Sequence, residues 1–554
     1  MPNSTHMDGK MTTISGSHAL AYGALDGGVQ FVTGYPGSPA TATVEALLEL
    51  AGADARIEWA INEKSAFDAA FGASLAGVPS LLCLKSVGLN VALDSLMVSN
   101  LAPGDGAFVI LVGDDPGGWG SQNEEDGRLL AAAAEVPLLE PPSARDARAT
   151  MHHAFQLSER FGLPVVVRIT RALSLASAGP TPQTPLPTSP RAARFRRQPV
   201  RFNVLPVHVV EFHQRLLATL AEVQSSFEGW PFNRQAGRGR AGIIAGGFAW
   251  QKLAEVLDAA PEAPPVRTLA LSSVHPLPEE TLRRFLAGLD AALVLEETAP
   301  YLEIQVQALA QRAALALPVY GRTSGHLPGA GELFAPEITQ ALAALLPDWP
   351  WPSAEGSPRA MPSRQPLCDG CPYLPTFEAL LEVMARRGGR DAFIVTGETG
   401  CMVRAQLPPL EIMDLKYGMG SSIGLAAGLA RSGVRQQLVA LSGDSAFLHS
   451  GLSELIDAAQ AGVAMLVVIL ANETTALSGG QPHPASAYDA TGQARRPVDL
   501  ASLVRAAGVE QITVLDAQDG SLLRGAFEAG LATEQLAVVI VQEPCPRWTA
   551  RWGL

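Results

Sequence analysis

Short apolar stretches that each end at a glycine- or proline-rich turn recur along the chain, with helix-like segments between them. In the first third of the chain they occupy 29–33, 80–84, 108–112 and 165–169, and they run into GYPGSP, KSVG, GDDPGG and TRALS. Strand, turn and helix repeated in this order predict an open sheet of parallel strands, whose ligands gather at the carboxyl ends of the strands. The sequence therefore predicts an α/β fold.

Two proline-rich stretches divide the chain, which at 554 residues is too long for one hydrophobic core. GPTPQTPLPTSP and an arginine-rich run open a linker over 181–240, and DWPWPSAEGSPRAMPSRQP marks a second linker over 346–365. We expect a first domain over 10–180, a middle domain over 241–345 and a third over 366–548. The apolar stretches of the third domain predict strands at 392–396, 438–441, 466–470 and 538–541.

Charge and hydropathy exclude several classes of partner. The chain carries 40 Lys and Arg against 54 Asp and Glu, a net charge of -14, whereas nucleic acids and anionic membranes favour basic surfaces. The longest apolar run, Val463–Ala471, is far shorter than the roughly 20 residues that cross a bilayer. No signal-peptide pattern opens the chain. We therefore expect a cytoplasmic protein that binds neither nucleic acid nor membrane.

A Gly-Asp-Ser turn follows one apolar strand, and an asparagine follows the next. Gly443, Asp444 and Ser445 come after LVALS, and Asn472 comes after LVVILA, with a helical segment between the strands. A strand–helix–strand unit brings both positions to the carboxyl edge of the sheet. A carboxylate and an amide oxygen suit Mg²⁺, which usually keeps phosphate oxygens in its shell. Gly443 would let the backbone approach a diphosphate closely.

Two interpretations of this turn are open on the residues alone. Asp444 could be the N-cap of an ordinary strand-to-helix turn, or Asp444 and Asn472 could be the magnesium ligands of a thiamine diphosphate motif. The run GDSAFLHSGLSELIDAAQAGVAMLVVILANETTALSGGQPHP favours the second, because it closely resembles the corresponding stretch of the indolepyruvate ferredoxin oxidoreductase alpha subunit family. In that family the Asn usually follows an Asp, whereas Asn472 follows Ala471.

The resemblance extends over most of the chain. It is carried by GYPGSP, KSVGLNVALD, GSQNEEDGR, WPFNR, SGHLPGAGEL and YGMGSSIGLAAG. Membership of this family of thiamine diphosphate-dependent 2-oxoacid:acceptor oxidoreductases implies three doubly wound, parallel-sheet domains, which are in order pyrimidine-binding, transketolase-C-like and diphosphate-binding. It also implies that Gly443, Ser445 and Thr474 bind the cofactor.

The resemblance implies further site residues. Glu63, in a segment similar to the family's Trp-x-x-Asn-Glu-Lys, would hydrogen-bond the far ring nitrogen of the cofactor's pyrimidine; its other reading is a helix-capping residue. Ser38 of GYPGSP would lie near the substrate, or be a simple turn hydroxyl. Met419 and Gly420 would line the thiazolium ring. His449 could transfer protons or have a structural role.

The cysteines decide between kinds of thiamine enzyme. Five cysteines in so long a chain do not make a disulfide scaffold. Cys368 and Cys371 form a Cys-x-x-Cys pair, which alone is compatible with zinc or free thiols. Together with Cys401 and Cys545 the pair resembles the ligands of the [4Fe-4S] cluster in 2-oxoacid:ferredoxin oxidoreductases. Cys83, in an apolar strand, is expected to be a core residue.

The resemblance implies a catalytic large subunit that oxidatively decarboxylates a 2-oxoacid, with aryl-pyruvates such as indolepyruvate or phenylpyruvate as the expected substrates. Coenzyme A would take the acyl group, and electrons would pass through the cluster to an acceptor such as ferredoxin. The family's ferredoxin-like tail is missing up to Leu554, so the acceptor and the smaller subunit are expected to be separate chains. Two alternatives stay open: a non-oxidative decarboxylase or carboligase, and a non-catalytic subunit.

Overall fold

The computed structural model describes residues 11–52, 55–182, 184–351 and 365–552. Most of the linker expected over 346–365 therefore lies outside the described residues. The chain forms two compact units, whose described residues fall in the ranges 1–57 with 63–361, and 58–62 with 362–554. No described helix is both long enough and apolar enough to cross a membrane.

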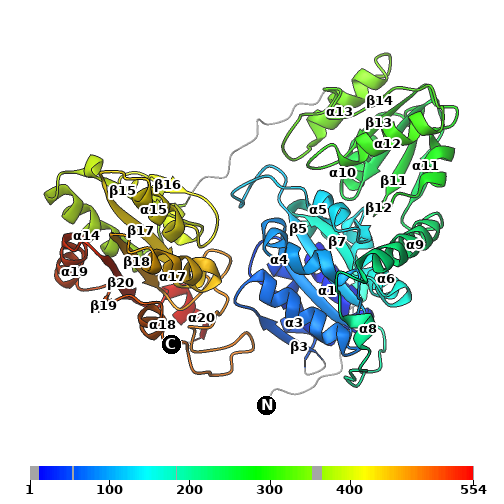
Figure 1. The fold of residues 1–554 in the computed structure, drawn as a ribbon. Helices are drawn as coiled ribbons and strands as arrows, with labels where there is room; N and C mark the ends of the chain where they lie inside the picture. The colour runs from blue at the N-terminus through cyan, green and yellow to red at the C-terminus, as the bar shows by residue number, and fades with distance from the viewer. Residues whose placement is uncertain (1–10, 53–54, 183, 352–364, 553–554) are drawn as a thin grey trace. The chain divides into compact units, whose positions relative to one another are not determined.

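The first unit contains a seven-stranded sheet (Figure 1). Its order is β12-β6-β7-β5-β4-β2-β3, and the strands are β2 (Phe31–Gly34), β3 (Arg56–Trp59), β4 (Ser80–Lys85), β5 (Phe108–Asp114), β6 (Leu138–Leu139), β7 (Val165–Thr170) and β12 (Ser273–His275). The central pairs β2–β4, β4–β5 and β5–β7 are parallel. Every residue of β5 is buried, as expected for a parallel strand with helices on both faces.

Helices follow the strands of this sheet in the order that the strand–turn pattern predicts. They are α1 (Gly16–Asp26), α2 (Thr41–Leu50), α3 (Glu63–Leu75), α4 (Ser86–Ser99), α5 (Gly127–Ala133), α6 (Ala144–Phe161) and α7 (Arg171–Leu175). Local sequence sets the ends of α6: the Ser143 side chain accepts a hydrogen bond from the Asp146 N–H, and Gly162 ends the helix at a φ of 67°. A two-stranded sheet of β1 (Met11–Ser15) and β8 (Ser177–Pro182) completes this part.

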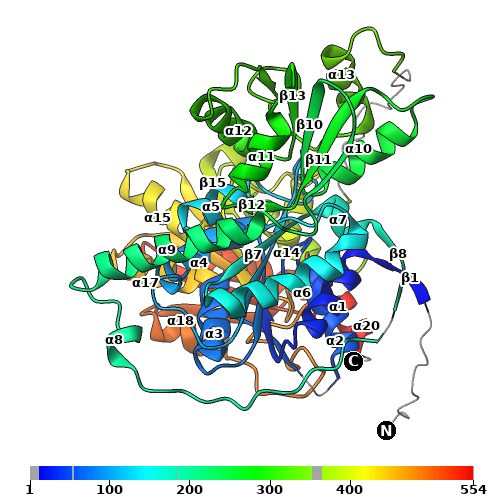
Figure 2. The ribbon, with the colours of Figure 1, turned by 90° about the vertical axis from the view of Figure 1, so that its right-hand side faces the viewer.

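The range 181–240 contains a long helix before the next sheet begins. Helix α9 (Val209–Phe227) follows the short α8 (Pro199–Phe202), and it lies beside α6 in both ribbon views (Figures 1 and 2). The rings of Trp230 and Phe232, from the WPFNR segment, pack edge-on against His153 of α6. This range is therefore partly a packed element of the first unit.

The middle range forms a five-stranded sheet of order β14-β13-β10-β11-β9. Its strands are β9 (Arg234–Gly237), β10 (Ala241–Gly246), β11 (Val266–Leu271), β13 (Ala291–Leu295) and β14 (Val319–Tyr320), with helices α10 (Ala249–Asp258), α11 (Glu279–Leu286), α12 (Tyr301–Arg312) and α13 (Ala335–Leu345). All pairs are parallel except β9 with β11. Strand β12, although it follows β11 directly, pairs antiparallel with β6 of the seven-stranded sheet. Consecutive strands of one chain segment, β11 and β12, therefore belong to the five-stranded and the seven-stranded sheet of the first unit.

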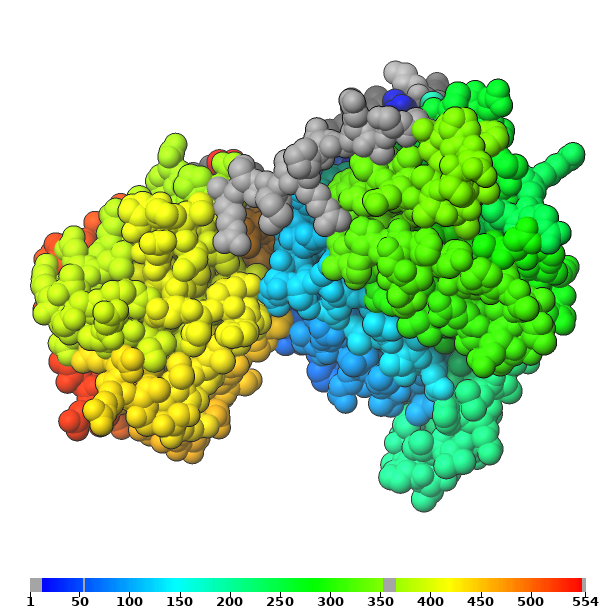
Figure 3. All heavy atoms as spheres, turned by 90° about the horizontal axis from the view of Figure 1, so that it is seen from above, coloured from blue at the N-terminus to red at the C-terminus, as the bar shows by residue number. Residues whose placement is uncertain are grey.

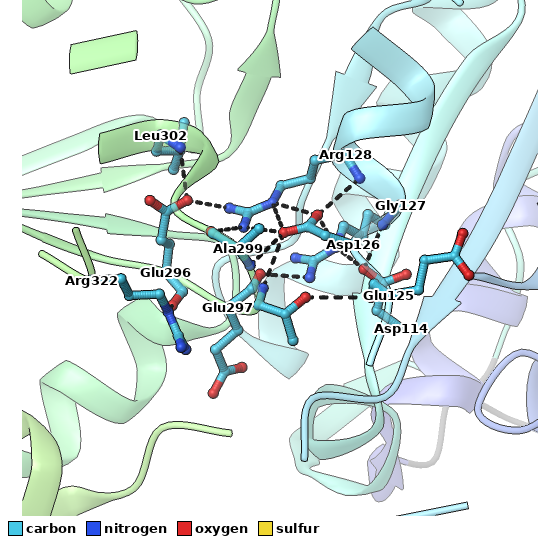
Figure 4. Close-up of polar contacts among 12 residues, drawn as sticks. Asp114, Glu125, Asp126, Gly127, Arg128, Glu296, Glu297, Ala299, Leu302 and Arg322 are labelled. Atoms are coloured by element: carbon cyan, nitrogen blue, oxygen red, sulfur yellow. Dashed lines mark hydrogen bonds and ion pairs between the residues drawn. The ribbon is translucent and has the colours of Figure 1, made fainter. Parts of the chain in front are cut away.

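Buried ion pairs also join these two sheets (Figure 4). The Arg128 guanidinium, which is fully buried at the start of α5, pairs with Asp126 at 2.5 Å and reaches Glu296, after β13, at 2.7 Å. Arg168 of β7 pairs with Asp114 at 2.5 Å and donates to the Glu297 carbonyl at 2.6 Å. In the space-filling view, green atoms of the middle range adjoin cyan atoms of the first range (Figure 3).

The second unit is built on one sheet of six parallel strands, of order β16-β15-β17-β18-β20-β19. The strands are β15 (Phe393–Gly397), β16 (Leu415–Lys416), β17 (Gln437–Gly443), β18 (Met465–Ala471), β19 (Gln511–Asp516) and β20 (Leu536–Gln542). Separate hydrophobic clusters cover the two faces of the sheet. The principal helices are α14 (Tyr373–Arg386), α15 (Ser422–Arg431), α17 (Leu452–Gln460), α18 (Leu500–Ala506) and α19 (Gly520–Ala532). The parallel α/β sheets predicted from the sequence are thus confirmed.

Candidate active site

Asp444 and Asn472 stand at the carboxyl ends of two neighbouring strands. Gly443, the last residue of β17, pairs with Leu470 of β18, so the next residues of both chains emerge at one edge of the sheet. The Asp444 carboxylate is buried and accepts backbone hydrogen bonds from Ser445 at 2.8 Å and Glu473 at 2.7 Å. These bonds hold two carboxylate oxygens in place, which is what a hard cation such as Mg²⁺ requires of its ligand.

The Asn472 side chain is also held on both sides. Its Nδ2 donates to the Tyr373 hydroxyl at 2.9 Å, and its Oδ1 accepts from the Thr474 N–H at 3.1 Å. Ser445, on the Asp444 side, shares a 2.8 Å hydrogen bond with the Thr475 hydroxyl. The two strand ends are therefore linked to each other as well as to the sheet.

His483 is a buried neighbour of Asp444 that the sequence reasoning missed. Its Nε2 lies 3.2 Å from the Asp444 carboxylate, and its Nδ1 accepts from the Ala485 N–H at 3.2 Å. It comes from the irregular segment between β18 and α18. This segment has no helical or strand periodicity from which the position of a side chain could be predicted. Its position in the family-like stretch SGGQPHP was the available indication.

The residues expected to line the thiazolium ring meet at Ser450. The Ser450 hydroxyl donates to the Met419 carbonyl at 3.0 Å and shares a 3.1 Å hydrogen bond with His449 Nδ1. Gly420 adopts a φ of +76°, and a Cβ there would lie only 2.0 Å from the Ser450 Oγ. Only glycine fits so close an approach in this backbone conformation. His449 lies in a single π-helical turn after the Gly-Asp-Ser turn, a feature that is frequent at functional sites.

Glu398 is a second residue that the sequence reasoning missed. It follows β15, is fully buried, and its Oε1 accepts from the Ser442 hydroxyl at 2.6 Å and from the Gly443 N–H at 3.2 Å. Its Oε2 is buried without a hydrogen-bond partner. Burial raises the pKa of Glu398 to about 8, because a charged carboxylate is poorly solvated there. A carboxyl group that keeps its proton near neutral pH thus lies against the diphosphate motif.

The four cysteines named from the sequence line one cavity of about 260 Å³, which Asn472 also lines. The volume far exceeds the roughly 10–15 Å³ that one water molecule needs. Cys371 donates its N–H to the Cys368 carbonyl at 3.0 Å, and Cys545 donates its N–H to the Asn472 carbonyl at 3.0 Å. Burial raises the pKa of Cys401 to about 12, and the neighbouring thiol of Cys371 adds to the shift. A cation in the cavity would reverse such a shift by stabilising the thiolates.

The described residues contain no group of three or more His, Cys, Asp or Glu side chains arranged to hold a metal ion. Cys83 belongs to the first unit, lies within β4 and is 1% exposed. Burial raises its pKa well above the usual value. Cys83 is thus the core residue that its sequence context predicts.

Two expected residues belong to the first unit. Glu63 is the first residue of α3 and is 7% exposed. A Cβ at Gly88, in the first turn of α4, would lie 2.7 Å from the Glu63 Oε1, so this glycine makes room for the carboxylate. Ser38 is exposed in the turn after β2, between the buried Pro36 and Pro39. Ser38 follows β2 and Glu63 follows β3 of the seven-stranded sheet, and ligands of parallel sheets bind beyond the carboxyl ends of their strands.

Comparison with known proteins shows where this arrangement belongs. Residues 398–541 match the family model "Thiamine pyrophosphate enzyme, C-terminal TPP binding domain", a range that includes Asp444 and Asn472. A solved structure, 2-oxoglutarate:ferredoxin oxidoreductase from Magnetococcus marinus, is similar at 18% identity and a TM-score of 0.46, over 58% of this chain and 63% of that one.

Three relatives are similar to this protein over nearly its whole length. The indolepyruvate oxidoreductase subunit IorA of Archaeoglobus fulgidus is 33% identical over 97% of this chain and 87% of its own length. The protein of the same name from Thermococcus kodakarensis is 32% identical over 97% and 86%, and that from Methanothermobacter thermautotrophicus is 33% identical over 97% and 87%. The chain therefore belongs to the IorA family of indolepyruvate oxidoreductase subunits.

Proposed function

We propose that the chain is the catalytic large subunit of a thiamine diphosphate-dependent oxidoreductase that oxidatively decarboxylates an aryl-pyruvate. Indolepyruvate and phenylpyruvate are the substrates that best fit the proposal, because the relatives that cover nearly the whole chain are named for indolepyruvate. Coenzyme A would receive the acyl group and carbon dioxide would be released. The two electrons would leave through an iron–sulfur cluster.

The observation that carries the proposal is the cavity shared by the four cysteines and Asn472. A non-oxidative decarboxylase has no need of a redox centre, whereas an oxidoreductase needs one close to its organic cofactor. Cys368, Cys371, Cys401 and Cys545 offer the four thiolates that a [4Fe-4S] cluster takes. When bound, such a cluster accepts and passes on single electrons.

The edge formed by β17 and β18 fits a magnesium diphosphate group. Asp444 and Asn472 offer oxygen ligands at adjacent strand ends, and Gly443 presents its backbone without a side chain. The close approach at Gly420 leaves no room for a Cβ beside Ser450. Thiamine diphosphate, when bound, supplies the nucleophilic carbon and the electron sink for the loss of carbon dioxide.

Four side chains would handle protons or orient the reacting groups. Glu63 would hydrogen-bond the pyrimidine nitrogen and hold a proton at that atom. His449, held by Ser450, would exchange protons with the reacting groups, and the exposed hydroxyl of Ser38 would orient the substrate. Glu398, with its unpaired buried Oε2, would present a neutral carboxyl group to the diphosphate, which a charged carboxylate would repel.

Further chains would complete the enzyme. The relatives are named as subunits, which supports a smaller oxidoreductase subunit on a separate polypeptide. Electrons would pass to ferredoxin or to another redox protein. The net charge of -14 gives no support to nucleic acid as a partner.

The test is a coupled assay of the anaerobically purified chain with its smaller subunit. Indolepyruvate, phenylpyruvate, pyruvate and 2-oxoglutarate are supplied separately with coenzyme A, thiamine diphosphate, Mg²⁺ and a viologen dye. We expect dye reduction and acyl-coenzyme A formation to be fastest with the aryl-pyruvates. Dye reduction should require both coenzyme A and thiamine diphosphate.

Two variants control the assay. Asp444→Ala should lose activity and Mg²⁺-dependent retention of thiamine diphosphate. Asp457→Ala, which alters an exposed carboxylate paired with Arg431, should keep both. Release of aldehyde without any dye reduction by the wild-type protein would instead identify a non-oxidative decarboxylase.

A further inference from the structure

Tyr373 directly follows the cavity-lining residues Cys371 and Pro372 in sequence and contacts Asn472, which also lines the cavity. It is the first residue of α14, two positions after Cys371, and its ring is 5% exposed. Its hydroxyl accepts from the Asn472 Nδ2 at 2.9 Å and donates to the Leu470 carbonyl at 3.4 Å. A Cβ at Gly443 would lie 3.7 Å from the same hydroxyl. The hydroxyl therefore contacts the end of β18 and lies close to the end of β17, the two strands that carry the diphosphate motif.

A second contact joins Asn472 to the cysteine cavity. The Cys545 N–H donates to the Asn472 carbonyl at 3.0 Å. Cys545 follows β20, which is the other neighbour of β18 in the sheet. Asn472 is thus held by its side chain through Tyr373 and by its backbone through Cys545, and both contacts come from the segments that carry the cavity's cysteines.

The two contacts connect Asn472 to the two turns that carry Cys371 and Cys545. Without a bound group, the Cys-x-x-Cys turn and the turn at Cys545 are held relative to each other only by contacts within the protein. A group bound by all four thiolates would fix both turns to one another, and with them Tyr373 and the backbone of Asn472. A ligand side chain that is fixed in advance binds its metal with a smaller loss of conformational entropy.

We infer that Tyr373 is a positioning residue that couples the two sites, so that a filled cysteine cavity strengthens the binding of magnesium thiamine diphosphate. The inference rests on the proposed function, because it requires both groups to bind this chain. Coupling between two binding equilibria is reciprocal. Bound thiamine diphosphate therefore also strengthens retention of the group in the cavity.

The experiment compares two forms of the same protein under anaerobic conditions. One form is the iron-loaded chain, and the other is the chain stripped of iron by a chelator. Titration calorimetry measures the dissociation constant of thiamine diphosphate at saturating Mg²⁺ for each form. We expect the loaded wild type to bind at least about fivefold more tightly than the stripped wild type, the lower end of typical coupling.

Tyr373→Phe keeps the ring and removes only the hydroxyl. It should keep the iron content and the visible absorption of the wild type, while the ratio of the two dissociation constants falls toward one. Tyr320→Phe is the matched control, because this residue lies in β14 of the first unit and stacks on His326. The control should keep the wild-type ratio. An unchanged ratio in Tyr373→Phe would overturn the role of the hydroxyl.

Reciprocity supplies a measurement that needs no variant. The rate of iron loss to a chelator is followed in the wild type with and without magnesium thiamine diphosphate, and the cofactor should slow the loss. Wild-type protein that binds the cofactor equally well in both forms would overturn the coupling while leaving the proposed function intact. Wild-type protein that binds no thiamine diphosphate in either form would overturn the proposed function itself.

Discussion

The Nε2 atom of His483 lies 3.2 Å from the Oδ2 atom of Asp444, and both side chains are 3% exposed. Because His483 Nδ1 accepts a hydrogen bond from the Ala485 N–H, the neutral ring carries its proton on Nε2, facing the carboxylate. The imidazole therefore packs against the Asp444 carboxylate from a different loop, although its Nε2 does not meet hydrogen-bond geometry there. Losing a residue that packs against a metal ligand typically lowers metal affinity about 10- to 100-fold.

Replacing His483 should weaken the metal–diphosphate site without abolishing it. In His483→Ala, Asp444 keeps its backbone hydrogen bonds from Ser445 and Glu473 but loses the imidazole. We expect thiamine diphosphate affinity at fixed Mg²⁺ to fall on the order of 10- to 100-fold, measured by calorimetry. Wild-type affinity in this variant would show that the imidazole has no part in the site.

Glu398→Gln should change how stability depends on pH. The raised pKa of about 8 in the folded chain means that the unfolded chain ionises first as pH rises above about 4.5. The wild type therefore loses stability between these two values, by at most about 1.4 kcal/mol per pH unit from this group. Glutamine cannot ionise, so the variant should not lose this stability as the pH rises.

The measurement is the melting temperature of both proteins from pH 5 to 9. The advantage of Glu398→Gln over the wild type should grow up to about pH 8 and then level off. A difference that is the same at every pH would show that Glu398 ionises at its ordinary pKa.

Two substitutions in the first unit test Glu63 in different ways. Glu63→Gln removes the charge, and Gly88→Ala keeps the charge but inserts a methyl group 2.7 Å from the present position of the Glu63 Oε1. Both should bind thiamine diphosphate, and both should slow exchange of its C2 proton. We expect about a 100-fold or greater slowing for Glu63→Gln and a smaller one for Gly88→Ala, by NMR after acid quench. Wild-type exchange in Glu63→Gln would assign the task to another residue.

Arg128→Met tests the buried ion pairs of the first unit. The variant leaves Asp126 and Glu296 without their common partner, and breaking a buried pair typically costs about 3–5 kcal/mol. Burial already raises the pKa of Glu296, so proton uptake by this unpaired carboxyl group should partly restore stability as the pH falls. The exposed pair of Arg283 with Glu280 is the control, and Arg283→Met should leave the melting temperature almost unchanged.

The sheets could be predicted from the sequence because buried parallel strands are continuous apolar runs. The strand expected at 466–470 is β18, extended by one residue at each end, and 438–441 is the centre of β17. Strand β19 could not be predicted in this way, because most of its residues are exposed or half-buried. Strand β12 pairs with β6 of the seven-stranded sheet. The two strands are far apart in the sequence, so no local pattern indicates this pairing.

The same contrast holds for the candidate site. Asp444 and Asn472 follow apolar strands, so parallel-sheet geometry alone brings them to one edge. Glu398 follows a strand as well, but its carboxyl group is held by Ser442 and Gly443 at the end of β17, which lie more than forty residues further along the chain. His483 and Tyr373 reach the site through an irregular loop and a helix start, whose positions follow from tertiary packing.

Anaerobic iron, sulfide and zinc analysis of the purified chain measures what the cysteine cavity holds. We predict brown protein with about four irons and matching labile sulfide per chain. Cys401→Ala should bleach the protein and stop dye reduction, whereas Cys83→Ala, which alters the core cysteine of β4, should do neither. Colourless wild-type protein, whether zinc-loaded or metal-free, would contradict the oxidoreductase assignment and favour a non-oxidative thiamine enzyme.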